Sequence, residues 1–152
     1  MLYRIYSWNF VLTASLIGWF AAQIIKTFIY SYLNGGFDLS RMWGDGGMPS
    51  AHSATVCAMV AAIARTQGMH TAIFGLACIF AFITMHDAMG VRRETGEQAK
   101  VLNNMIAQWD DIATGNSPFM DQKQLKEMVG HTPLQVVCGG ALGALVGVLL
   151  PL

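Results

Sequence analysis

Two histidines lie in short polar motifs whose residue types suit phosphoryl transfer. His52 lies in the segment GMPSAHS, residues 47–53, and His131 lies in the segment GHTP, residues 130–133. Two imidazoles beside one phosphate can divide the work, because one attacks phosphorus while the other protonates the leaving oxygen. The chain has no HExxH pattern and no clustered acidic ligands, so we expect chemistry without a metal or another cofactor.

Several cationic side chains could surround the phosphate that this chemistry needs. They are Lys26, Arg41, Arg92 and Arg93. An arginine offers planar paired donors, whereas a lysine offers a point charge. Ser50, at the expected start of a helix, adds backbone N–H groups and the positive end of the helix dipole. The alternative for the four cations is that they reach lipid headgroups and set the topology.

The composition indicates a membrane protein. The chain has 152 residues, of which 54% are hydrophobic and only 12% charged, against roughly a quarter charged in soluble domains. The formal net charge is zero, so no basic surplus exists to bind nucleic acid. Three cysteines without CxxC spacing are expected to pack as small core residues. The length fits one domain, residues 1–152.

Four apolar stretches can position the polar residues, at about 8–33, 51–64, 71–89 and 134–152. Crossing a bilayer takes roughly 20 residues, so we expect an all-α integral membrane bundle of about four spans. The second stretch is short and, alone, also fits a buried helix of a soluble protein. Gly139, Gly143 and Gly147 share one face of the last stretch and allow close approach of another helix, in this chain or in a second copy of a homo-oligomer.

The loop between the third and fourth stretches contains a further helix. Apolar residues repeat at helical spacing over residues 94–111, with a polar face between them. This amphipathic pattern predicts an interfacial helix that lies along the membrane surface.

An up-and-down path through four spans brings the candidate residues to one side of the membrane. The end of span one, the start of span two, the end of span three and the start of span four share that side. Asp87 ends span three, where a carboxylate is costly without a partner. We therefore expect Asp87 to form a salt bridge with Arg92 or Arg93.

Three segments in this order resemble the divergent branch of the type-2 phosphatidic acid phosphatases, relatives of the vanadium haloperoxidases. Residues 47–53 (GMPSAHS) are similar to the PSGH motif. Residues 87–93 (DAMGVRR) match the divergent branch. Residues 131–136 (HTPLQV), followed by a glycine-rich helix, are similar to the HxxxD motif.

The resemblance implies a role for each matching residue. His131 would be the nucleophile that forms a phosphohistidine, and His52 the acid that protonates the leaving group. Ser50 and nearby backbone would hold phosphate oxygens. Lys26 and Arg41 would correspond to the lysine and arginine of the family's first motif, although they are spaced more widely.

Two departures from the family pattern stand out. Gln135 occupies the position of the family's acid, and a neutral amide orients an imidazole but stabilises an imidazolium less. Asp87 could supply that charge instead. The arginine expected shortly before the nucleophile is absent, and Arg92 or Arg93 could replace it.

The expected function is an integral-membrane, metal-independent phosphatase of a lipid phosphomonoester of the phosphatidic acid, phosphatidylglycerophosphate or isoprenyl phosphate type. The departures favour an alternative, a non-catalytic lipid-phosphate-binding or transport-accessory protein on the same scaffold. A structural subunit of a membrane complex is a third reading. The expected location is a bacterial inner or organellar membrane. Most Lys and Arg residues lie on the motif side, against Arg4 and Arg65 on the other, which places the site toward the cytoplasm.

Overall fold

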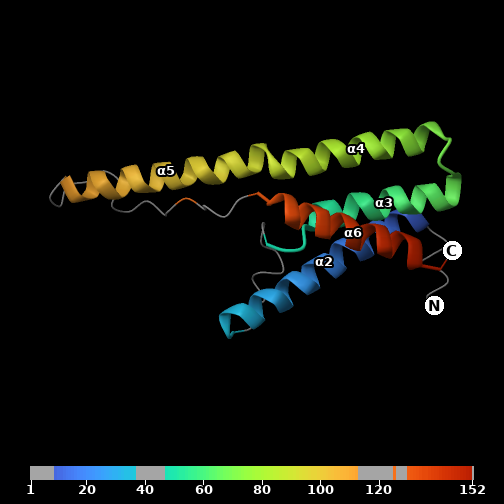
Figure 1. Cartoon of the computed structure of the whole chain (residues 1–152), viewed down its shortest axis with the longest axis horizontal. Helices are drawn as coiled ribbons and strands as arrows, with labels where there is room; N and C mark the ends of the chain where they lie inside the picture. Colours follow the sequence, from blue (N-terminus) through green and yellow to red (C-terminus); the bar gives the residue numbers. More distant parts are fainter. Residues whose placement is uncertain (1–8, 37–46, 113–124, 126–129, 152) are drawn as a thin grey trace.

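Every regular element in the described part of the chain is a helix. The computed structural model describes residues 9–36, 47–112, 125 and 130–151. Its helices are α2 (Phe10–Asn34), α3 (Ala51–Gln67), α4 (Ala72–Met89), α5 (Val91–Ile112) and α6 (Pro133–Leu149). Figure 1 shows α2, α3 and α6 gathered in a bundle, with α4 beside α3 and α5 extending beyond them. The four predicted apolar stretches are therefore confirmed as helices.

Helix α3 is the centre of the bundle, although it is the least apolar of the four core helices. It packs against α2, α4 and α6. Its inner positions are small: Ala54, Ala58 and Ala62 are completely buried. Small side chains let helices approach closely, which in a membrane replaces the hydrophobic driving force as a source of packing energy.

Glycines on the neighbouring helices face this alanine surface. A methyl group added at Gly139 would clash with the carbonyl of Ser50, and one at Gly143 with the carbonyl of Ala54. One at Gly147 would lie 2.6 Å from the Ala61 side chain. The predicted glycine face of the last helix therefore packs within the chain, with α6 backbone against α3 backbone.

The large apolar side chains point outward instead. Phe28 of α2 and Leu76 and Phe82 of α4 are each about two-thirds exposed. Two helices of the described part, α2 and the continuous rod Ala72–Gln108, are long and apolar enough to cross a membrane. A small-residue interior with a bulky apolar exterior is what helices packed in lipid require.

Helix α5 confirms the helix predicted over residues 94–111, but its direction differs from the one expected. The Gly90 N–H donates to the His86 carbonyl (2.9 Å), and the Gly90 carbonyl accepts from Arg93 and Glu94 (3.0 Å each). Because these bonds cross the junction, α5 continues the line of α4 away from the bundle (Figure 1). An axis across the end of the bundle, as a helix lying along the membrane surface would have, is not observed.

Arg65 closes the other end of the bundle. Its Nη1 donates to the carbonyls of Gly147 (2.9 Å) and Leu150 (2.6 Å), which satisfies acceptors that the end of α6 leaves open. Its guanidinium also lies 5.7 Å from the centre of the Phe10 ring, within cation–π range. One side chain of α3 thus ties the end of α6 to the start of α2.

The close packing of α6 on α3 gives the first prediction. Gly143→Ala should lower the free energy of unfolding by about 1–3 kcal/mol, because backbone must move to admit the methyl group. Gly75→Ala is the matched control, since nothing lies within 4 Å of a methyl group there; it should be neutral or stabilise by about 0.5–1 kcal/mol. Thermal unfolding in detergent measures both. Equal effects of the two variants would contradict the packing argument.

Candidate functional site

Two backbone hydrogen bonds join the segments that carry the candidate residues. The N–H of Ser50, just before α3, donates to the carbonyl of Gln135 in the first turn of α6 (3.0 Å). The N–H of His131, just before α6, donates to the carbonyl of Ala88 near the end of α4 (2.9 Å). The starts of α3 and α6 and the end of α4 therefore meet at one end of the bundle.

The two histidines predicted to act together are adjacent. Their ring centroids lie 5.9 Å apart, with the ring planes at 65°. His131 is buried, with 3% of its surface exposed, and His52 is partly exposed. Because near-attack distances are about 3–3.5 Å, one phosphoryl group at the mouth of this pair could contact both rings.

Gln135 fixes the orientation and the tautomer of His131. Its Oε1 accepts the N–H of Thr132 (3.0 Å) as part of the capping box that begins α6, in which Thr132 Oγ1 accepts the Gln135 N–H (3.4 Å). Nδ1 of His131 lies 3.2 Å from the same Oε1. An amide oxygen only accepts, so Nδ1 carries a hydrogen in this contact. When the ring is neutral, Nε2 then has the lone pair that a nucleophile needs.

Burial lowers the pKa of the His131 imidazole below its ordinary value. The nearby charges of His52 and Lys26 lower it further, while hydrogen bonds to the Gln135 side chain and to the Gly47 backbone partly oppose the shift. His131 therefore stays neutral, and able to attack, at a pH where an exposed histidine would already bind a proton.

Lys26 belongs to α2, so a further helix contributes a side chain to the site at the starts of α3 and α6. It is buried, with 7% exposed, and its charge acts on His131. Its aliphatic carbons cover Gly47, where an added methyl group would lie 3.0 Å from Cδ. Gly47 has φ +86°, so a side chain there would be strained as well as crowded.

Ser50 is completely buried and caps α3. Its Oγ accepts the Ser53 N–H (3.4 Å) and hydroxyl (3.1 Å). The Ser50 side chain is therefore held in the α3 cap, beside the site. Its predicted contact with phosphate stays a prediction.

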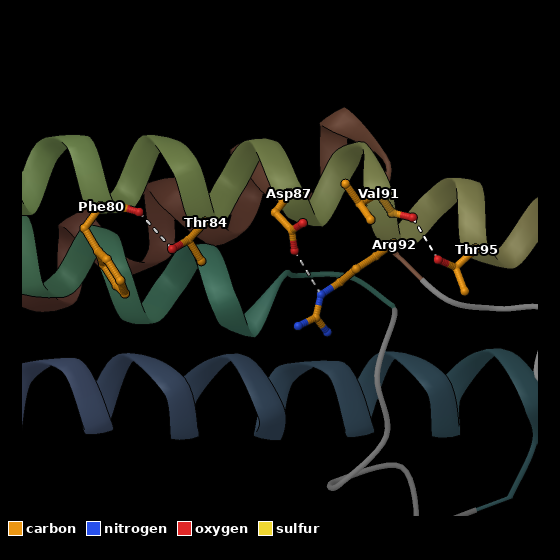
Figure 2. A network of polar contacts seen from close by, with 6 residues as sticks. All are labelled: Phe80, Thr84, Asp87, Val91, Arg92 and Thr95. Carbon is orange, nitrogen blue, oxygen red and sulfur yellow. Dashed lines mark hydrogen bonds and ion pairs between the residues drawn. The ribbon is translucent and has the colours of Figure 1, made fainter.

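Asp87 and Arg92 form the predicted salt bridge. Arg92 Nε lies 3.3 Å from Asp87 Oδ2, and both side chains are nearly half exposed. Figure 2 shows the Arg92 side chain reaching back along the rod to the Asp87 carboxylate. The described partner of His131 Nδ1 is Gln135, so the ring-orienting position holds an amide and Asp87 lies with Arg92.

Arg93 contributes its backbone to the site, and its side chain is exposed. A methyl group added at Gly130 would lie 2.5 Å from the Arg93 nitrogen, and Gly130 has φ +90°. The chain therefore crosses the first turn of α5 at a glycine before it reaches His131.

Farther along α5, Asn103 exchanges two hydrogen bonds with the backbone of Leu125 (2.9 and 3.0 Å). Arg41, the remaining predicted cation, lies outside the described residues.

Sequence reasoning missed three contributors to this arrangement. The T-x-x-Q pattern at Thr132–Gln135 is a capping-box signal, and it would have shown that Gln135 serves the helix start as well as the histidine. Gly47 and Gly130 had no such signal, because their importance lies in contacts with Lys26 and Arg93. Within the described residues, no three His, Cys, Asp or Glu side chains gather as a metal site.

The tautomer and pKa of His131 can be measured together. In protein labelled with ¹⁵N-histidine, we expect the His131 ring to show the Nδ1–H tautomer and to titrate below pH 6.5, because its folded-state pKa is lowered. The signal that His131→Ala removes assigns the residue. An Nε2–H tautomer, or a midpoint at or above pH 6.5, would contradict the assignment.

Substitution at Gln135 should move that titration in opposite directions. Gln135→Glu adds a negative charge beside Nδ1, so the pKa of His131 rises. Gln135→Leu removes a hydrogen bond that holds the pKa up, so the pKa falls further. The same NMR titration measures both variants. If they shift the midpoint in the same direction, Gln135 does not act on the imidazole through its side chain.

Known proteins place this arrangement in a family. Residues 7–146 match the divergent PAP2 family. The chain is similar to a Bacillus subtilis (strain 168) protein named "Uncharacterized membrane protein YuiD", with 39% identity over 148 residues that cover 93% of this chain and 94% of the relative. No solved structure matches it. With two helices able to cross a bilayer and histidines brought together from the PSAH and HTPLQ segments, this chain is a membrane protein that belongs to the divergent PAP2 family.

Proposed function

We propose that this protein is a membrane phosphatase that hydrolyses a lipid phosphomonoester through a phosphohistidine on His131. The observation that carries the proposal is the buried His131, held by Gln135 in the Nδ1–H form, with the His52 ring 5.9 Å away. A phosphatase needs a nucleophile with a free lone pair and an acid on the other side of phosphorus, and these two rings provide both.

The proposed reaction has two displacements. Nε2 of His131 attacks phosphorus, the bond between phosphorus and the alcohol oxygen breaks, and His52 gives that oxygen its proton. Neutral His52 then takes a proton from water while the water oxygen attacks phosphorus. The N–P bond breaks, its electron pair returns to Nε2, and phosphate leaves. No metal or cofactor enters either step.

Charge around the site supports an anionic substrate. Lys26 and His52 both act as positive neighbours of His131, and the start of α3 points its positive dipole end here. Arg92 is paired with Asp87, which precedes the Ala88 whose carbonyl accepts the His131 N–H, and we propose that Arg92 and Arg41 also contact phosphate. A phosphomonoester carries the negative charge that these groups would balance.

The second candidate is a lipid-phosphate-binding or transport-accessory protein without turnover. Gln135 favours it, because phosphohistidine formation leaves positive charge on a ring whose described Nδ1 partner is a neutral amide. Both candidates use the same cationic groups around the site to bind phosphate. The two candidates differ only in whether the covalent step proceeds.

We propose that the site faces the cytoplasm. Arg92, Arg93 and Lys100 lie on α5, which continues from the end of α4 that contacts His131. At the other end, the Arg65 side chain caps α6. Excess positive charge on one side of short membrane proteins marks the cytoplasmic side.

The decisive measurement is phosphate release from lipid phosphates by the purified protein in detergent with EDTA. His131→Ala should abolish release, and His52→Ala should reduce it about 10²–10⁴-fold, the usual contribution of a general acid. His70→Ala is the control, since His70 is exposed at the turn between α3 and α4.

Two outcomes decide between the candidates. Undiminished release by His131→Ala would refute the phosphohistidine mechanism. Saturable binding of a lipid phosphate with no release, even at high protein concentration, would identify the binding protein instead.

A further inference from the structure

An apolar cleft runs between α3, α4 and α6, beside the histidine site. Its volume is about 500 Å³, within the range of small-ligand pockets. It is lined by apolar and sulfur-containing side chains, among them Cys57, Val60, Phe82, Met85, Met89 and Ala144. From this cleft we infer that the substrate of the proposed phosphatase is a lipid phosphate with a single hydrocarbon chain, and that the chain lies here. The inference rests on the proposed function.

The cleft begins where the nucleophile is held. Met89 and His86 line it on α4, and between them lies Ala88, whose carbonyl accepts the His131 N–H. On α3, Cys57 is five residues beyond His52, a rise of roughly 7.5 Å. The cleft therefore begins within about two helical turns of the histidines.

The length of the cleft suits one lipid chain. It follows α4 from Met89 to Cys78, a rise of roughly 16 Å at 1.5 Å per residue. That is about half the 30 Å hydrocarbon core of a bilayer. A chain attached to a headgroup phosphate at the interface would reach the middle of the membrane along this path.

Small residues keep the cleft open, and flexible ones line it. A methyl group added at Gly140 would lie 3.3 Å from Cys57 Sγ and 3.8 Å from Met85 Cε. Cys57 and Met85 are themselves in contact, with their sulfur atoms 3.7 Å apart. Methionine adapts to irregular apolar shapes, so this wall can follow a hydrocarbon chain.

A second groove lies on the α2 side of α3. This groove, of about 370 Å³, lies between α2, α3 and α4. It extends from Asn9 and Gln67, at the end of the bundle opposite the histidines, to Thr55 and Val56 near the start of α3. It is the smaller of the two and shares no lining residue with the cleft. The cleft itself has room for one chain, which an isoprenyl phosphate or a single-acyl lysolipid phosphate supplies.

A filled cleft should exclude the chain. Ala144→Phe places a ring in the cleft from the exposed side of α6, and Ala141→Phe is the matched control on the same helix, exposed and outside the cleft lining. With long single-chain phosphates, Ala144→Phe should raise KM about tenfold or more, because several methylene groups lose their apolar contact. Release from a water-soluble phosphomonoester should be unchanged in both variants. If Ala144→Phe does not fold, Val60→Phe fills the cleft from α3.

Photo-crosslinking tests the position of the lipid's hydrocarbon chain and does not depend on enzymatic activity. Probes with a diazirine near the end of the chain are an isoprenyl phosphate, a lysophosphatidate, a diacyl phosphatidate and the isoprenyl alcohol. Both single-chain phosphates should label cleft residues such as Phe82 or Cys78 in wild type and Ala141→Phe, and lose that labelling in Ala144→Phe. When the two single-chain phosphates compete for the cleft, the one that labels it more strongly identifies the lipid class.

The outcomes separate this inference from the proposed function. Labelling of the cleft without phosphate release would refute the phosphatase and retain the chain site. Phosphate release with labels outside the cleft, with equal labelling by the diacyl probe or the alcohol, or with equal kinetics of Ala144→Phe and Ala141→Phe, would overturn the inference.

Discussion

The contact between the start of α3 and the first turns of α6 determines the geometry of everything near the histidines. The Ser50 carbonyl lies against the bare Cα of Gly139, and the Ser50 N–H donates to the Gln135 carbonyl. In lipid, helices gain little by hiding apolar surface from one another, so backbone proximity and hydrogen bonds must fix their register. This contact sets the register of His52 against His131, because each histidine lies within a few residues of it.

The same packing principle explains why the site lies at an end of the bundle and a cleft lies along its side. Alanine and glycine predominate where α3 meets α6 and α2, so these helices pack backbone against backbone. On the α4 side, methionine, cysteine and phenylalanine replace them and pack less completely. Polar groups gather where helices begin and end, since each helix start has N–H groups and each helix end carbonyls without a partner inside the helix. The headgroup layer is where such termini meet a phosphate.

Much of this could be predicted from the sequence, for identifiable reasons. Hydropathy locates the helices, and an up-and-down path then forces His52 and His131 to one end. The direction of α5 could not be predicted, because Gly90 looks like a break although hydrogen bonds cross it. The cleft could not be predicted either, because it depends on how Gly140 of α6 and Met85 of α4 meet. Whether Asp87 would pair with Arg92 or Arg93 depended on their directions around one helical turn, which spacing alone does not give.

Gln135 shows how one residue can separate binding from catalysis. Its amide oxygen serves two donors, the Thr132 N–H and the His131 ring, so it performs the structural task of a carboxylate without the charge. A carboxylate there would stabilise the imidazolium, but it would also offset the positive field of Lys26 and His52. The neutral amide keeps that field available to a doubly charged phosphate. In the proposed reaction this would favour retention of phosphate over stabilisation of the phosphohistidine, and the balance between these two effects would distinguish a slow phosphatase from a binding protein.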